Sequence, residues 1–488
     1  MKHSRLDKTR RLGLIMFLAN TTYLAWLFFH VVGALGWLFY AFEILVYIVS
    51  LLFLVNHWSR KFVLLGGEYS LRASVDVFIP TVDEPLKMLE ESMRAASQIQ
   101  HPSLYLYVLD DGGRAGVKKL AEKYGFTYLS RPDRAQKRYK SANMNYGLRF
   151  AKSPYVLTID ADNVVQPNIL DDLLGHFKDK EVALVASRQS FTVEDNDFNH
   201  DYMFYNHMQT GKNANDAAIS CGSGVIYRRK ALDAIGGFSE WNLVEDLHTS
   251  YIFHTKGYKS VYVSQPYVLG HAPTDLSAIY KQRGTWALDT LRIMYWQSPI
   301  FMSGLSFRQR LHYFEIGYCY LVSAFFLTGI YTINFYTLFT NIQIHNGGYW
   351  YIAFRLPALI ATLMFFGWLS RGQLTSRVWA GLFPVYARAA VLALFATKKP
   401  SYRVTPKTDH GKREAHLVFP QIAFLSIGYV ALAYNFLEYG VSTILLFSGF
   451  WIIVMTYWLL PIVMKGLQLG EYSKKTRRAP VLTSAQQH

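Results

Sequence analysis

Six long apolar segments constrain the fold of this chain more than any other feature. A bilayer core is about 30 Å thick, so a helix that crosses it needs roughly 20 apolar residues. Charged residues make up only 17% of the chain, against roughly 25% in a typical soluble protein. The sequence therefore predicts a membrane protein with six spans. The six segments are 12–30, 35–55, 313–335, 349–369, 418–437 and 441–464.

Lysine and arginine are concentrated at the two ends of the chain, and this bias orients membrane spans. The tails carry basic residues such as Lys8 and Lys474, whereas the connections 31–35 and 336–348 contain no lysine or arginine. With six spans, both tails and the long segment after the second span are predicted to face the cytoplasm. The first apolar run lacks a small-residue cleavage site, so we expect an anchor rather than a signal peptide.

The net charge of +16 does not indicate nucleic-acid binding, because no basic stripe is interleaved with base-reading motifs. Cys221 and Cys319 lie far apart and lack zinc spacing. A disulfide framework is not expected, and a reducing cytosol fits better. Two amphipathic stretches, 275–298 and 375–397, are predicted to lie in the membrane interface rather than to cross it.

The segment 57–300 has the pattern of a soluble α/β domain. Apolar strands are predicted at 75–79, 104–109 and 155–159, and helices at 87–97 and 115–124 lie between them. This alternation predicts a parallel sheet. Ligands bind beyond the carboxyl ends of the strands in such sheets. Acidic residues directly after the strands are therefore candidates for a site.

Three acidic turns follow these strands. Asp160-Ala161-Asp162 can share one Mg²⁺ or Mn²⁺ with a diphosphate, although a solvated turn is the alternative. Asp110-Asp111-Gly112-Gly113 suits close approach to a nucleotide, with a tight turn as the alternative. Asp83 has the same two interpretations. A sugar transfer from a nucleoside diphosphate would use such carboxylates to hold a divalent metal, which neutralises the leaving diphosphate.

Two further motifs suit the remaining parts of such a reaction. Glu245 and Asp246 form an acidic pair that would supply a base if buried, or would complement a helix dipole. Gln282 opens the run Gln-Arg-Gly-Thr-Trp, in which Arg283 could pair with phosphate and Trp286 could stack on a sugar. The alternative for Trp286 is an interfacial membrane anchor.

The order of these motifs is more specific than any one of them. Lys140-Ser141-Ala142-Asn143 lies between the turn at Asp110 and the turn at Asp160. Cys221-Gly222-Ser223-Gly224 lies between the turn at Asp160 and Glu245. The run 402–407, Tyr-Arg-Val-Thr-Pro-Lys, follows the fourth span. In this order the chain resembles the processive family-2 glycosyltransferases, and cellulose synthase catalytic subunits most closely.

The resemblance implies a Rossmann-like α/β domain of the GT-A type, inserted in an α-helical transmembrane bundle, that inverts the anomeric carbon. It implies Asp162 as the ligand of Mg²⁺ or Mn²⁺, and Asp246, with Glu245 beside it, as the catalytic base. The implied donor-binding residues are Asp83, Asp111, Lys140, Asp160 and Arg283. The implied acceptor-binding residues are Trp286, Cys221, Gly222 and Gln282. The implied gating-loop residues are Tyr402, Arg403, Thr405 and Lys407.

Two departures from the family pattern stand out. Thr285 occupies the position of an arginine that helps to hold the diphosphate, and Arg283 and Arg403 are the candidates to replace it. Only about two dozen residues follow the last span, which is too few for a cyclic-di-GMP-binding PilZ barrel. That form of control is therefore not expected.

The leading hypothesis is a processive synthase that makes a β-linked glucan such as cellulose from UDP-glucose and translocates it. A chitin, hyaluronan or poly-GlcNAc synthase using UDP-GlcNAc is the alternative within the class. Two further hypotheses are a lipid-linked sugar transferase and a transporter with an inert cytoplasmic domain. Expected partners are the UDP-sugar, the growing polysaccharide, the bilayer, and accessory export subunits or further copies of the chain.

The expected location is the inner or plasma membrane, with the catalytic domain in the cytoplasm. Glu43, Glu315 and Arg355 lie in or near the spans and are candidates to line a glycan channel or to reach the interface. The expected domains, in order, are 1–56 (tail and two spans), 57–272 (catalytic), 273–312 (interfacial), 313–370 (two spans), 371–416 (interfacial helix and gating loop), 417–465 (two spans) and 466–488 (basic tail).

Overall fold

Short apolar runs rich in β-branched residues form the strands of one eight-stranded sheet. The structure is a computed structural model and describes residues 2–63, 73–133, 139–193, 198–273, 275–372, 374–398 and 414–469. The sheet order is β3-β2-β1-β4-β7-β6-β8-β5. The strands are β1 (Val75–Thr81), β2 (Leu104–Asp110), β3 (Thr127–Leu129), β4 (Tyr155–Thr158), β5 (Asn163–Val165), β6 (Val182–Phe191), β7 (Val225–Arg228) and β8 (Lys259–Gly270).

The sheet is mixed, so the prediction of a purely parallel sheet was incomplete. Strands β3, β2, β1 and β4 are parallel, as the three predicted strands required. Strand β7 then pairs antiparallel with both β4 and β6. The period-2 pattern of a strand does not encode the direction of its neighbour, which is why the sequence did not reveal this reversal.

Amphipathic helices cover the sheet. In α3 (Leu86–Ala96), Leu89, Met93 and Ala96 recur at helical spacing on one face, and all three are buried. The sheet domain also contains α4 (Ala115–Tyr124), α5 (Lys140–Leu148), α6 (Ile169–Leu173), η1 (Leu174–Lys178), η2 (Phe198–His200), η3 (Phe204–Met208), α7 (Gln209–Asn213), α8 (Arg229–Ala234) and α9 (Glu245–Thr255).

Six helical segments of the described chain are long and apolar enough to cross a membrane, and they match the six predicted spans. The first two are α1 (Lys2–Phe28) and α2 (Gly33–Asn56). The third runs from α11 (Phe307–Leu321) through a single π-turn, η4 (Val322–Phe326), into α12 (Leu327–Thr340). The others are α13 (Trp350–Leu369), α16 (Phe419–Tyr439) with the preceding η5 (Ala415–Val418), and α17 (Thr443–Leu467).

Three more helices lie where the sheet domain meets the bundle. They are α10 (Leu276–Trp296), α14 (Leu374–Gly381) and α15 (Phe383–Phe395). The last two are bent by 54° relative to each other, and together they are long and apolar enough to form one broken span. The predicted interfacial stretch 375–397 is therefore helical but broken, and these helices raise the upper count of spans to seven.

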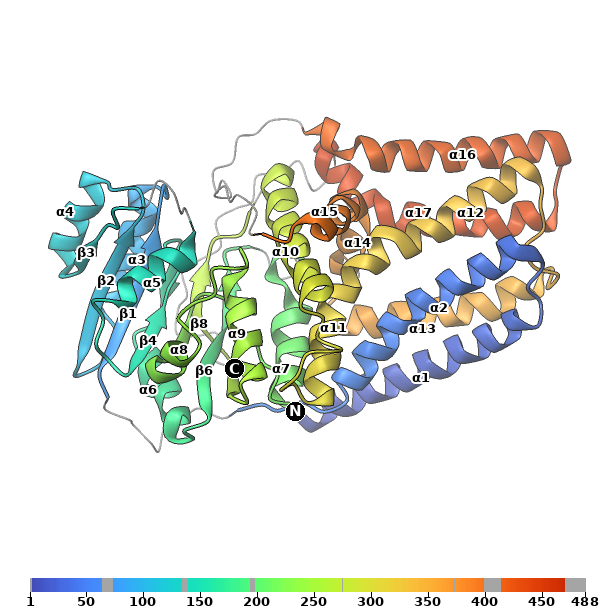
Figure 1. Cartoon of the computed structure of the whole chain (residues 1–488). Helices are drawn as coiled ribbons and strands as arrows, with labels where there is room; N and C mark the ends of the chain where they lie inside the picture. The colour runs from blue at the N-terminus through green and yellow to red at the C-terminus, as the bar shows by residue number, and fades with distance from the viewer. Residues whose placement is uncertain are drawn as a thin grey trace.

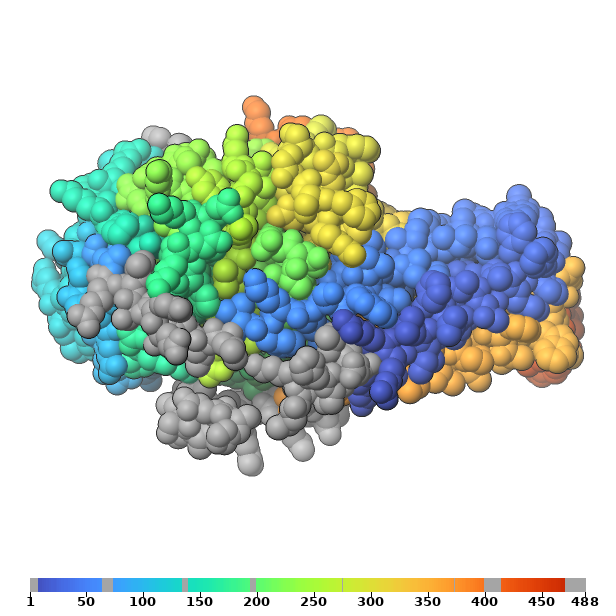
Figure 2. Space-filling model, turned by 90° about the horizontal axis from the view of Figure 1, so that it is seen from below, coloured from blue at the N-terminus to red at the C-terminus, as the bar shows by residue number. Residues whose placement is uncertain are grey.

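The sheet domain lies at one end of the molecule and the apolar helices extend away from it (Figure 1). Figure 2 shows α1 in dark blue lying along α13 in orange, and the Asn20 amide joins them by donating to Thr362 at 3.0 Å. A capping box starts α11, in which Ser306 and Gln309 each accept from the other's backbone amide. Helices α10 and α11 therefore connect the sheet domain to the bundle.

Candidate active site

The carboxyl ends of β1, β2 and β4 meet at one edge of the sheet. Thr81 lies opposite Asp110 in the β1–β2 pair, and Phe78 lies opposite Thr158 in the β1–β4 pair. The Asp111 amide then donates to the Thr81 carbonyl at 2.9 Å. The parallel register brings the turns after all three strands to the same edge.

The two aspartates of the turn after β2 have different surroundings. Asp110 accepts from the amides of Gly112 at 3.0 Å and Arg114 at 2.6 Å, so it shapes the turn. Asp111 instead pairs with Arg131 through two hydrogen bonds of 2.7 Å. Burial raises the pKa of Asp111, and the Arg131 guanidinium opposes that rise. Sequence reasoning missed Arg131, because no local motif indicated its partner 20 residues earlier.

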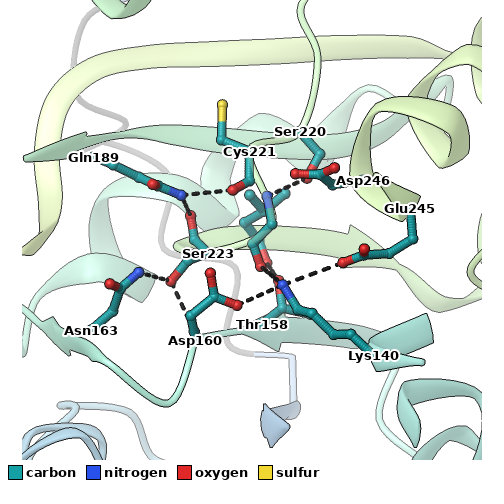
Figure 3. A network of polar contacts seen from close by, with 12 residues as sticks. Lys140, Thr158, Asp160, Asn163, Gln189, Ser220, Cys221, Ser223, Glu245 and Asp246 are labelled. Atoms are coloured by element: carbon teal, nitrogen blue, oxygen red, sulfur yellow. Dashed lines mark hydrogen bonds and ion pairs between the residues drawn. The ribbon is translucent and has the colours of Figure 1, made fainter. Parts of the chain in front are cut away.

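Lys140 is the cation at the centre of the site (Figure 3). Its Nζ lies 2.5 Å from Asp160 Oδ1 and 3.3 Å from Glu245 Oε1. It also donates to the Gly222 carbonyl at 3.3 Å. Burial opposes its charge, yet Asp160, Glu245 and Asp246 together raise the pKa of Lys140 well above its usual value. Lys140 therefore stays protonated and draws carboxylates from distant parts of the chain into one place.

Gly222 lies directly against this cluster. Its φ is +82°, and an added Cβ would lie 2.9 Å from Lys140 Nζ and 3.1 Å from Asp246 Oδ2. A positive φ and so close an approach both favour glycine. The Gly222 carbonyl also accepts from the Thr158 hydroxyl at 3.0 Å. The loop 221–224 is thus fixed beside the cation and the acidic pair.

Side chains of the sheet hold that loop. The Gln189 amide donates to the carbonyls of Cys221 at 2.8 Å and Ser223 at 3.1 Å. The Ser223 hydroxyl accepts from the Asp160 amide at 3.0 Å and from the Asn163 side chain at 2.6 Å. The turn after β4 and the loop are therefore braced against each other, as Figure 3 shows.

Asp246 has the electrostatics of a base. Burial, and then the charge of Glu245, raise the pKa of Asp246 to about 7. Asp289 of α10 is fully buried and accepts from the backbone amides of Leu243 and Val244. It thereby holds the segment that carries the acidic pair. Asp289 is a second residue that the sequence did not reveal, because its role depends on contacts some 45 residues away in the chain.

Asp160 and Asp162 fit a divalent cation. Burial and the charge of Asp162 raise the pKa of Asp160, while Lys140 opposes that rise, so the two carboxylates stand close and repel each other. Hard cations with oxygen ligands relieve such repulsion. The described residues contain no group of three or more His, Cys, Asp or Glu arranged to hold an ion. A metal here would take its remaining ligands from a diphosphate and water.

Arg283 and Trp286 form a second group, on α10. Arg283 Nη2 lies 2.9 Å and 3.0 Å from the two carboxylate oxygens of Asp201, and the guanidinium lies 4.7 Å from the centre of the Trp286 ring. The Thr285 hydroxyl donates back to the Lys281 carbonyl at 2.8 Å. The charge of Arg283 is thus neutralised within the protein.

Cys221 precedes Gly222 in the loop 221–224. Burial raises the pKa of its thiol, and the carboxylates of Asp246 and Asp201 raise it further. Gln282, one residue before Arg283, is half-buried on the same helix.

Asp83 is the predicted donor-binding residue that lies apart from these contacts. Asp83 is exposed after β1, beside Glu84, whose carboxylate accepts from the Thr81 hydroxyl at 2.6 Å and the Val82 amide at 2.8 Å. The predicted gating loop lies outside the described residues, namely Tyr402, Arg403, Thr405 and Lys407.

Comparison with known proteins finds two matching families. The profile of glycosyl transferase family 2 matches residues 76–236, and the cellulose synthase profile matches residues 234–367. The chain is 32% identical over 295 residues to a UDP-forming cellulose synthase catalytic subunit of Xanthomonas axonopodis pv. citri, covering 58% of this chain and 40% of the relative. It is 33% identical over 254 residues to that of Komagataeibacter xylinus, covering 49% and 34%. The match thus spans less than half the length of these relatives.

Among solved structures, the mannosyltransferase PcManGT from Pyrobaculum calidifontis, in complex with GDP-Man and Mn²⁺, superposes with a TM-score of 0.55 at 18% identity. The match covers 74% of this chain and 99% of that one. At this identity the likeness concerns the fold, which is that of a GT-A glycosyltransferase, as the sequence predicted.

Proposed function

We propose, from the premise that this chain belongs to the family-2 glycosyltransferases of the cellulose synthase type, that it polymerises a β-glucan such as cellulose from UDP-glucose, inverts the anomeric carbon, and moves the product across the membrane. The observation that carries the proposal is the convergence of Asp160, Glu245 and Asp246 on Lys140. This convergence supports a site in which a base, carboxylates for a cation and a fixed positive charge act together. A transporter with an inert domain would need none of them.

Each of these residues has its own role in the proposed reaction. Asp246 accepts the proton of the acceptor hydroxyl, because its pKa of about 7 lets it exist as a carboxylate and still take up a proton. Lys140 faces the diphosphate, and Asp111, fixed by Arg131, faces the nucleoside. A divalent ion at Asp162, Mg²⁺ or Mn²⁺, supplies charge stabilisation to the leaving diphosphate when bound.

We assign the acceptor end of the glycan to the group formed by Arg283, Asp201 and Trp286. Trp286 provides an aromatic face for a sugar ring, and the Arg283–Asp201 ion pair holds the position of that face. Since Arg283 is already paired, we assign it to the acceptor side rather than to the diphosphate. We assign Lys140, 2.5 Å from Asp160 Oδ1, to the donor side instead.

The membrane helices provide the path along which the product crosses the bilayer. The sheet domain, within 57–272, is proposed to face the cytoplasm, where nucleotide-sugars are made, and the apolar helices extend from it on the far side of α10 and α11 (Figure 1). The basic tails of the sequence support this orientation. The location is the inner or plasma membrane, and further subunits or copies of the chain are compatible with it.

A donor assay tests the proposal. The purified chain in lipid, given Mg²⁺ or Mn²⁺, is expected to build a polymer from radiolabelled UDP-glucose that an endo-β-1,4-glucanase degrades. UDP-GlcNAc and UDP-glucuronate serve as competing donors. Incorporation from UDP-GlcNAc alone, into a product that chitinase degrades, would move the chain to the alternative synthase class. A short lipid-linked product would exclude processive synthesis.

The pH dependence of polymer synthesis should follow Asp246. A base works when deprotonated, so kcat/KM should fall as the pH drops through about 7, where burial and Glu245 place the pKa of Asp246. In Glu245→Gln the neighbouring negative charge is gone, so the pKa of Asp246 falls and the acid limb of the profile should move to lower pH. A rate profile from pH 5 to 9 measures the shift. If the acid limb of the rate profile stays at the same pH in this variant, a group other than Asp246 controls it.

A further inference from the structure

A buried ionic cluster lies where the sheet domain meets the membrane helices. Glu315 of α11 is fully buried, and its carboxylate accepts from Asn56 Nδ2 at 2.8 Å and lies 2.9 Å from His57 Nε2. Asn56 ends α2 and His57 follows it. His312, one turn before Glu315 on α11, is buried as well, with its Nδ1 3.8 Å from Glu315. The structure thus places Glu315 in a buried cluster between α2 and α11.

The sheet domain contributes its own cation to this cluster. Lys212 of α7 is buried, and its Nζ donates to the His312 carbonyl at 3.0 Å. Burial lowers the pKa of Lys212 to about 8, and the charge of Glu315 opposes that change. Asn215, just after α7, reaches His312 Nε2 at 3.0 Å. A short helix of the sheet domain is therefore joined to α11 by a buried hydrogen bond from a lysine.

Gln209, the first residue of α7, holds the loop 221–224. Gln209 Nε2 donates to the Ile219 carbonyl at 2.6 Å and to Cys221 Sγ at 3.3 Å, and Gln209 Oε1 accepts from the Ile219 amide at 3.2 Å. Lys212 lies three residues after Gln209 on the same helix. Movement of α11 relative to the sheet would thus reach the loop 221–224 through a single turn of helix.

We propose that Lys212 and Glu315 are positioning residues that tie α11 to the loop 221–224, so that the acceptor glycan is presented in register with the membrane helices. The proposal rests on the proposed function for its meaning. Burial of charged residues is costly unless hydrogen bonds compensate for it, and apolar residues of similar size would pack the same space. Together the two residues connect three segments that are far apart in the sequence: the end of α2, α7 and α11.

The test uses the full chain in lipid and separates donor chemistry from chain extension. In Lys212→Met, polymer synthesis is expected to fall at least tenfold, while slow hydrolysis of UDP-glucose without acceptor stays within about twofold. The donor cluster should be preserved because Gln189 and Ser223 still brace it. Arg308→Met, which removes an exposed cation from the same helix α11, is the control and should change neither rate. A parallel loss of both activities would overturn the proposal.

A second readout does not require an active enzyme. In a Cys319→Ala background, Cys221 is the remaining thiol, and its rate of reaction with a methanethiosulfonate reagent reports the position of the loop. Lys212→Met should raise that rate at least fivefold. If this variant fails to fold, Lys212→Met/Glu315→Gln removes both charges together and is expected to show the same rise. An unchanged rate in a folded variant overturns the proposal, whereas absence of polymer from the wild-type chain would count against the proposed function alone.

Discussion

An Asp246→Asn variant is expected to lose polymer synthesis by roughly 10²–10⁴-fold, the range for loss of a general base. Asparagine has the same shape but cannot take up the proton of an acceptor hydroxyl. The ion pairs of Lys140 with Asp160 and Glu245, at 2.5 Å and 3.3 Å, do not include Asp246. The donor cluster should therefore persist, and calorimetry should show UDP binding within a few-fold of the wild-type affinity.

Asp233→Asn is the matched control for this variant. Asp233 is 57% exposed and pairs with Arg229 on the surface helix α8, so the same chemical change there should leave synthesis unaltered. If Asp246→Asn abolished UDP binding as well, the carboxylate would be a structural member of the cluster. If it kept full synthesis, the base would have to lie elsewhere.

The elements with a strong local signal could be predicted from the sequence. The strands 75–79, 104–109 and 155–159 are found within a few residues as β1, β2 and β4, and the six apolar segments are found as helices. Each of these depends on a periodicity or a length that the chain carries locally. The common location of the acidic turns could also be predicted, because the carboxyl ends of parallel strands meet at one edge of the sheet.

The partners of the site residues could not be predicted, because they come from distant parts of the chain. No sequence feature near Arg131 indicates its pairing with Asp111. In the sequence, Asp289 resembles any other polar residue on the exposed face of an amphipathic helix, although it holds the backbone at Val244. Arg283 was considered for the diphosphate from its place in the motif 282–286, and its ion pair with Asp201 was not visible in the sequence. A motif identifies the chemical type of a side chain, whereas tertiary packing decides whether its charge is free to act.

Removal of divalent ions is expected to abolish synthesis, and ion and donor should bind together. A bound metal stabilises the developing diphosphate by several kcal/mol, and each 1.36 kcal/mol is a factor of ten in rate. EDTA should therefore reduce synthesis by about 10³-fold or more, and Mg²⁺ or Mn²⁺ should restore it. Asp162→Asn should raise the ion concentration needed for half-maximal rate. Asp172→Asn, a carboxylate of α6 that bonds Tyr267 and Asn168, is the control.

The mutual dependence of ion and donor follows from the geometry of the site. Asp160 is paired with Lys140 at 2.5 Å, and the described residues hold no three-ligand cluster, so these residues by themselves offer too few oxygens for tight binding. The diphosphate of the donor has to complete the coordination shell. Titration of Mn²⁺ followed by electron paramagnetic resonance should therefore show weak binding to the free chain and much tighter binding once UDP is present. Equal affinity with and without UDP would mean that the ion is held by protein ligands alone, and synthesis that continues after exhaustive chelation would remove the metal from Asp162 altogether.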